Sequence, residues 1–243
     1  MFQGIDIGST TTKIVKMDGD SLIKQIIPTI KFIYSTEKDY FNAVSTGYGR
    51  FTIKSSKVIP EIRAHVLGAL FQTELRDFTL LDIGGQDYKI VHVVNGVIQD
   101  FLTNDKCAAG TGRFLEKMAQ VLDVTIDEIS KHYRDPVKLN STCTVFAETE
   151  LISRMMEGYP KESLMAGVNY SVFERIRPFL LRFKSPTIVF TGGVAKNGAI
   201  VEIIRQELGK EVVVPGDPQA NGAIGCAYYA KKLNLRSQHH ISL

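Results

Sequence analysis

The sequence predicts an α/β protein, and three observations carry this prediction. The order strand, aspartate, glycine loop, strand occurs twice, at Asp6-Ile7-Gly8 and again at Asp82-Ile83-Gly84. An apolar strand at 187–191 runs through two glycines into a helix. Apolar residues also recur at helical spacing at 60–74 and behind residue 114. Strands and helices therefore follow one another along the chain.

Composition excludes several classes of protein. The 243 residues are 44% hydrophobic and 23% charged, which is typical of a globular protein with a sizeable core. The net charge of +3 gives no indication of nucleic acid or a membrane surface. No apolar run has the length of a membrane span, and the first residues resemble a strand rather than a signal peptide. Three widely spaced cysteines make no disulfide framework, so we expect a cytoplasmic protein.

The first glycine loop lies between two expected strands, 2–7 and 14–17, ahead of a hairpin turn at 18–21. It contains Gly8, Ser9, Thr10, Thr11, Thr12 and Lys13. Backbone N–H groups and hydroxyls of such a loop donate to phosphate oxygens, and a lysine adds positive charge. The alternative is a tight hairpin with a solvent-exposed lysine.

The second loop repeats this device. A strand at 78–83 leads into Gly84, Gly85, Gln86 and Asp87, and a strand at 88–94 ends at an Asn-Gly turn. The occurrence of the same strand–aspartate–glycine pattern twice is stronger evidence for a functional loop than either copy alone. Two such elements facing each other would bind a polyphosphate, with Asp6 and Asp82 beside a magnesium ion. The alternative is that both aspartates only cap turns.

The third element is the strand 187–191 with the glycines behind it. Bare backbone at a strand–glycine–helix junction accommodates a flat ligand such as adenine and ribose. The expected nucleotide contacts here are Gly192, Gly193, Val194, Asn197 and, from a later loop, Gln219. We expect a strand at 212–214, a last helix at 223–233 rich in small residues, and a frayed tail from 236.

Two cysteines occupy matching positions. Cys107 stands three residues ahead of Gly110-Thr111-Gly112, where a helical pattern starts, and Cys143 lies in a Ser/Thr cluster that opens another helix. Helix N-termini favour a thiolate or an anionic ligand. Either the two cysteines belong to one shared site, or they are two ordinary buried thiols. Cys226 has small apolar neighbours, and we expect it in the core.

Together the three glycine elements resemble those of the actin, sugar kinase and heat-shock chaperone ATPase superfamily. Residues 6–13 resemble its first phosphate motif, 82–87 its second and 191–195 its adenosine motif. Residues 104–114 and 141–148 narrow the resemblance to the activator components of 2-hydroxyacyl-CoA dehydratases. That family includes the related ATP-dependent reductases of benzoyl-CoA-reductase-like and double-cubane-cluster proteins.

The resemblance implies two ribonuclease-H-like lobes with ATP or ADP and Mg²⁺ in the cleft between them. The first lobe would comprise residues 1–95 and the helix 223–234, and the second residues 96–222. Cys107 and Cys143, but not Cys226, would be iron–sulfur ligands. A [4Fe–4S] cluster takes four thiolates, so a homodimer would hold one cluster on its twofold axis.

The implied activity is ATP-dependent one-electron donation under anaerobic conditions. A ferredoxin or flavodoxin would reduce the cluster, and an iron–sulfur dehydratase or reductase component would accept the electron. Two alternatives stay open. One is a small-molecule kinase of the same superfamily, although the chain leaves little room for a substrate domain. The other is a nucleotide-sensing scaffold with a structural cluster.

Several side chains are candidates for the hydrolytic step. Gln86 is the better candidate for orienting the attacking water, and Asp87 for contacting the metal. Glu148 either orders a water or is a solvated helix residue. Thr111 and Arg113, with Gly110 and Gly112 in the same turn, would reach the phosphates. We expect structural or surface roles for the isolated histidines, His65, His92 and His132.

Overall fold

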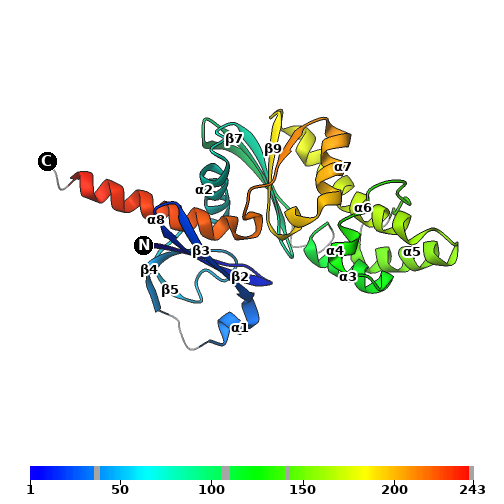
Figure 1. Cartoon of the computed structure of the whole chain (residues 1–243), viewed down its shortest axis with the longest axis horizontal. Coiled ribbons are helices and arrows are strands. Elements are labelled where there is room, and N and C mark those ends of the chain that lie inside the picture. Colours follow the sequence, from blue (N-terminus) through cyan, green and yellow to red (C-terminus); the bar gives the residue numbers. More distant parts are fainter. Residues whose placement is uncertain (36–38, 105–109, 141–142, 241–243) are drawn as a thin grey trace. The chain divides into compact units, whose positions relative to one another are not determined.

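The computed structural model describes residues 1–243 except 36–38, 105–109, 141–142 and 241–243, and the side chains of 235–240. The chain forms two compact units (Figure 1). The first unit comprises Met1–Arg76, Val93–Ile98 and Pro215–Leu243, and the second Asp77–His92 and Gln99–Val214. The expected division at residue 95 differs from this one, because the strands that begin at 78 and 88 belong to the second sheet.

The first unit is built on a mixed five-stranded sheet of order β3-β2-β1-β4-β5. Its strands are β1 (Phe2–Ile7), β2 (Thr11–Asp18), β3 (Ser21–Pro28), β4 (Asp39–Thr46) and β5 (Lys54–Val58). Its helices are α1 (Thr29–Ile33), α2 (Glu61–Thr73) and α8 (Asn221–His240), the last preceded by the 3₁₀ turn η2 (Pro218–Ala220). β1 is antiparallel to β2 and parallel to β4, which places Lys13 directly opposite Asp6.

Helix α8 packs against α2 and against β1, β2 and β4 of the same unit (Figure 1). The approach is so close that a Cβ atom on Gly225 would lie 1.8 Å from the carbonyl oxygen of Ala64. The small residues expected in this helix therefore serve packing. The helix is longer than predicted, since it continues to His240 through the segment expected to fray.

Apart from the end of β7 and the start of β8, which lie within Val93–Ile98, the second unit contains the sheet β10-β9-β6-β7-β8, in which β9 is parallel to both β6 and β10. Its strands are β6 (Phe78–Ile83), β7 (Tyr88–Val94), β8 (Val97–Thr103), β9 (Thr187–Thr191) and β10 (Glu211–Val213). Its helices are α3 (Gly112–Leu122), α4 (Ile126–Ile129), α5 (Thr144–Met156), α6 (Lys161–Arg182), η1 (Gly193–Lys196) and α7 (Gly198–Leu208). α6 contacts α3, α4, α5 and α7.

One large hydrophobic core joins these helices to the second sheet. Phe114 and Met118 of α3, Phe173 of α6 and Phe190 of β9 are fully buried in it. Burial of side chains of this size contributes about 1.5–3 kcal/mol each to folding. None of the helices in the described ranges is long and apolar enough to cross a lipid bilayer.

Candidate functional site

The first glycine loop is a tight turn held by α1. The N–H group of Gly8 donates to the carbonyl of Thr11 at 3.2 Å. Thr29, the first residue of α1, donates its hydroxyl to the Gly8 carbonyl at 2.7 Å and its N–H to the Thr10 carbonyl at 3.0 Å. The turn is shorter than predicted, because β2 already begins at Thr11.

Strand alternation divides the end of this loop between two faces. Thr12 is fully buried, and its hydroxyl lies 3.0 Å from that of Thr29, so this predicted phosphate donor is engaged inside the unit. Lys13 is on the other face, where its Nζ lies 3.4 Å from Oδ2 of the buried Asp6. The lysine and the aspartate predicted for phosphate and metal therefore form an ion pair.

The second glycine loop connects β6 to β7. The N–H of Gly84 donates to the Asp87 carbonyl at 2.9 Å, which closes the turn around the half-buried Gln86. Asp82 is 1% exposed and accepts the hydroxyl of Thr191 at 2.9 Å. Asp87 is paired at 2.6 Å with Lys89, a residue that the sequence motifs did not single out.

The turn in front of α3 is hydrogen-bonded to this second loop. The N–H groups of Gly112 and Arg113 donate to the carbonyls of Gly84 and Gly85 at 2.9 and 3.0 Å. The hydroxyl of the buried Thr111 also donates to the Gly85 carbonyl, at 2.9 Å. Thr111 thus holds the loop rather than presenting its hydroxyl to a ligand, whereas the Arg113 side chain is exposed.

The third glycine element has a backbone that only glycine adopts readily. Gly192 has φ +86° and ψ 177°, and a Cβ on it would lie 2.3 Å from the Ile83 carbonyl oxygen. Val194 is buried, and Gly193 is exposed. A flat ligand at this junction would therefore contact backbone atoms rather than side chains.

The Asn197 side chain, expected to contact nucleotide, has structural partners instead. Its Oδ1 accepts the N–H of Ile200 at 3.0 Å and so caps α7, and its Nδ2 donates to Asn169 at 2.9 Å. Gln219 is half-buried in η2 of the first unit.

The three cysteines have different surroundings. Cys143 is exposed and is the N-cap residue of α5, as predicted for a helix start. Cys226 is buried, which confirms its expected place in the core, and burial followed by the charge of Asp6 raises the pKa of its thiol well above the ordinary value. Cys107 lies outside the described residues. Among the described residues, no three His, Cys, Asp or Glu side chains gather as a metal site.

Glu148 follows Cys143 by five residues on α5. Its carboxylate lies 3.0 Å from Nζ of Lys117 on α3, and both side chains are partly exposed. This ion pair agrees with the alternative of a solvated helix glutamate. It also joins the helix behind Cys143 to the helix behind the Gly-Thr-Gly turn.

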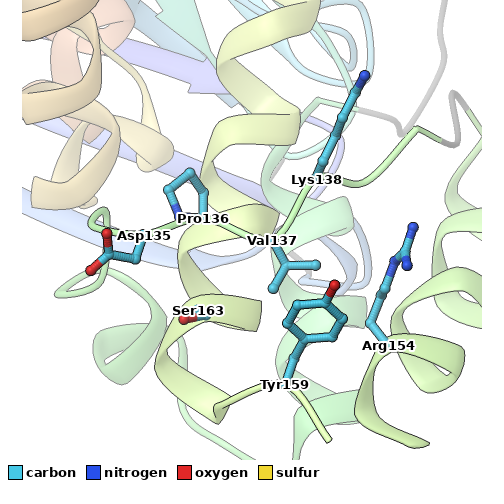
Figure 2. A pocket seen from close by; sticks show the side chains of 7 residues that line it. All are labelled: Asp135, Pro136, Val137, Lys138, Arg154, Tyr159 and Ser163. Carbon is cyan, nitrogen blue, oxygen red and sulfur yellow. The ribbon is translucent and has the colours of Figure 1, made fainter. Parts of the chain in front are cut away.

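A pocket of about 310 Å³ lies elsewhere in the second unit (Figure 2). It is lined by Asp135, Pro136, Val137, Lys138, Arg154, Tyr159 and Ser163. None of these residues belongs to the glycine or cysteine motifs. Arg154, which would be its strongest anion ligand, is already paired with Glu157 at 2.7 Å. The glycine loops therefore remain the better candidate site.

Comparison with known proteins agrees with these motifs. Residues 23–230 match the BadF/BadG/BcrA/BcrD ATPase family. The 2-hydroxyisocaproyl-CoA dehydratase activator of Clostridioides difficile is 39% identical, over 98% of this chain and 97% of the relative. The (R)-2-hydroxyglutaryl-CoA dehydratase activating ATPase of Acidaminococcus fermentans is 36% identical, over 94% and 96%.

Solved structures show the same similarity. The activator of the 2-hydroxyisocaproyl-CoA dehydratase from Clostridium difficile with bound ADPNP superposes with a TM-score of 0.88. It is 36% identical, with 98% of this chain and 97% of that one covered. The fold is thus the α/β fold of the actin-like ATPases, as the sequence predicted. From its sequence and its fold, this chain belongs to the BadF/BadG/BcrA/BcrD ATPase family.

Proposed function

We propose that this protein is an ATP-dependent one-electron donor that acts on a partner iron–sulfur enzyme. Two copies would share one [4Fe–4S] cluster, a ferredoxin or flavodoxin would reduce it, and ATP hydrolysis would drive the electron onward. The acceptor would be of the 2-hydroxyacyl-CoA dehydratase or double-cubane-cluster type. Membership of an ATPase family whose relatives are named dehydratase activators supports this proposal.

The observation that carries the proposal is the set of hydrogen bonds between the second glycine loop and the start of α3. Gly84 and Gly85 accept from the backbone of Gly112 and Arg113 and from the hydroxyl of Thr111. A loop that shifts with the phosphates of a nucleotide would shift this turn as well. Cys107 precedes the turn by three residues, so nucleotide state and cluster would be coupled over a short path.

The surroundings of Cys143 suit a cluster ligand. Cys143 is exposed at the N-terminus of a 13-residue helix, and helix N-termini favour a thiolate. Thiolates of Cys107 and Cys143 from two copies would supply the four ligands that a [4Fe–4S] cluster takes. Such a cluster stores and releases one electron.

The exposed face of α5 supports a dimer. Val145 and Phe146, two and three residues behind Cys143, are each 68% exposed, and Met156 at the other end of the helix is 85% exposed. Apolar side chains gathered on one helix favour coverage by another protein surface. A second copy seated there would bring a second pair of thiolates to the first.

The chain also carries groups suited to ATP hydrolysis. Lys13 and the N–H groups of Ser9 and Thr10 would bind phosphate oxygens. The carboxylates of Asp6 and Asp82, with Asp87 as a further candidate, are the oxygen ligands that Mg²⁺ prefers. Gln86, inside the turn, would orient the attacking water without acting as a strong base. A neutral amide in this role fits a slow ATPase coupled to another event.

The proposal is tested by measuring iron and acid-labile sulfide in anaerobically purified protein. We expect about two irons per chain, since four would be shared by two copies. Cys107→Ser and Cys143→Ser should lose the iron and weaken the dimer. Cys226→Ser, which changes a buried thiol, is the matched control and should keep both.

A folded wild-type protein that binds ATP but holds no iron would contradict the proposal. A phosphorylated small molecule in the same ATP assay would then identify a kinase. Iron that is present while ATP turns over only at the background rate would instead identify a scaffold.

A further inference from the structure

Lys89 is a buried cation that the proposed hydrolytic step does not use. It lies on β7, two residues behind the second glycine loop, and is 6% exposed. Lysine is almost never buried to this degree unless its charge is paired. The residues around its ammonium group therefore indicate its role.

The ammonium group of Lys89 lies near two carboxylates, one from Asp82 on β6 and one from Asp87 in the second glycine loop. Its Nζ is 2.6 Å from Oδ2 of Asp87 and 3.8 Å from Oδ2 of Asp82. Asp82 is buried and also accepts the Thr191 hydroxyl, whereas the Asp87 side chain is 40% exposed. One carboxylate is thus fixed in the interior, and the other can exchange its partner with a group arriving from solvent.

The charges in this cluster act on phosphate and metal in opposite directions. Without Lys89, the two carboxylates would attract a divalent cation and repel the phosphates of ATP. With Lys89 present, the three side chains of Asp82, Asp87 and Lys89 together carry one negative charge fewer. At separations of a few ångströms and an effective dielectric constant of about 20, one unit charge changes an ionic binding constant by about tenfold or more.

We propose that Lys89 is a positioning residue that competes with Mg²⁺ for Asp87. Its ammonium holds the Asp87 carboxylate and lowers the negative charge of the loop while no metal is bound. When Mg²⁺ arrives, Asp87 exchanges the lysine for the metal, and Lys89 keeps its contact with Asp82. This inference rests on the proposed binding of ATP and Mg²⁺ at the second glycine loop.

The test uses calorimetry on the full-length protein with two separate probes, ATP in the presence of EDTA and Mg²⁺ alone. Lys89→Met should weaken metal-free ATP binding by about tenfold and tighten Mg²⁺ binding by about tenfold. Lys89→Arg, which keeps the charge, should shift neither constant by more than about twofold. Lys131→Met is the matched control, because Lys131 forms an ion pair of the same 2.6 Å length with Asp127 on the surface.

The expected changes in ATP binding and in Mg²⁺ binding have opposite signs, and a purely structural role of Lys89 would not produce them. A Lys89→Met protein that binds both probes more weakly, or both unchanged, would overturn it. So would a Lys89→Arg protein that shifts as far as Lys89→Met.

Asp87→Asn provides an independent test if Lys89→Met does not fold, because Asp87 is partly exposed and its replacement leaves the core intact. It should bind metal-free ATP about tenfold more tightly and Mg²⁺ more weakly, and unchanged or weaker ATP binding would overturn the inference. Wild-type protein that binds no ATP, even with Mg²⁺, would overturn the proposed function instead.

Discussion

The buried hydroxyl of Thr111 donates a hydrogen bond to the carbonyl oxygen of Gly85 at a distance of 2.9 Å. A residue just ahead of a helix thereby fixes the carbonyl of a glycine in the second glycine loop. The same carbonyl accepts the N–H of Arg113, so both of its lone pairs are used. The contact is side chain to backbone, and a single substitution can remove it without changing the loop sequence.

Replacing Thr111 by valine should weaken the link between the loop and α3, which the N–H groups of Gly112 and Arg113 would still hold in part. The substitution keeps the shape of the side chain but removes the donor, while the Gly85 carbonyl keeps its bond from Arg113, so we expect a loss of about 0.5–1.5 kcal/mol in the free energy of unfolding. ATP turnover should also fall. Urea denaturation and a phosphate-release assay measure the two effects. Thr111→Ser retains the hydroxyl and should restore most of both, and a valine variant as active and stable as the wild type would refute the coupling.

Replacing Gly192 by alanine should destabilise the second unit. Its backbone dihedrals are strained for any residue with a Cβ, and the added methyl would lie 2.3 Å from the Ile83 carbonyl oxygen. We expect a cost of about 2–4 kcal/mol, measured by urea denaturation. Gly198→Ala is the control, because there the Cβ would meet only the Ser130 carbonyl at 3.6 Å. Equal stability of the two variants would show that the junction relaxes freely.

The buried thiol of Cys226 should make stability fall at alkaline pH. Burial, and then the charge of Asp6, raises the pKa of this thiol in the folded state. Above about pH 8.5 the unfolded chain releases this proton while the folded chain keeps it, so folding becomes less favourable as the pH rises. The slope should reach about 1.4 kcal/mol per pH unit.

The measurement is the free energy of unfolding between pH 8 and pH 10, from urea titrations. Cys226→Ala removes the thiol and should flatten the profile. A profile with the same slope in Cys226→Ala would assign the pH dependence to other groups.

Replacing Gln86 by alanine should lower kcat far more than it weakens ATP binding. If the amide orients the attacking water, its removal acts on the transition state and should cost roughly 100-fold in kcat. Gln86→Glu adds a negative charge beside Asp87 in the loop and close to Asp82 at the end of β6, and it should weaken ATP binding as well. Steady-state hydrolysis and nucleotide titration separate these effects. A rise in KM at unchanged kcat would assign Gln86 to binding alone.

The parts of the fold with strong local signals were predictable. The apolar strand before Asp82 and the Ser/Thr cluster at Cys143 are signals that act over a few residues, and both elements begin where the sequence indicated. The hairpin turn at 18–21 was predicted, but the extent of the following strand β3 was not, because most of its side chains are exposed and its pattern carries no alternation. Residues 223–233 were recognised as helix, but not its continuation to His240.

The candidate site was predictable in its motifs and less so in its contacts. The spacing of glycines and aspartates identified both loops. No spacing rule could indicate that Thr12 turns inward to Thr29, or that Asn197 caps α7 and holds Asn169. These roles depend on residues distant in the sequence. Lys89 belongs to none of the sequence motifs, and only its burial near Asp82 and Asp87 in the structure identifies it as a candidate.

The close packing of α8 on α2 sets an order for the maturation of the protein. β1 precedes the second unit in the chain, yet the helix that covers β1 is synthesised only after the whole second unit. The apolar surface of β1 and α2 therefore stays exposed until α8 is synthesised. By then, every strand of the second sheet has already been synthesised. Where Gly225 meets Ala64, the gap admits no side chain. A nascent chain halted before α8 would thus be a target for chaperones or proteases, although most of its sequence has been translated.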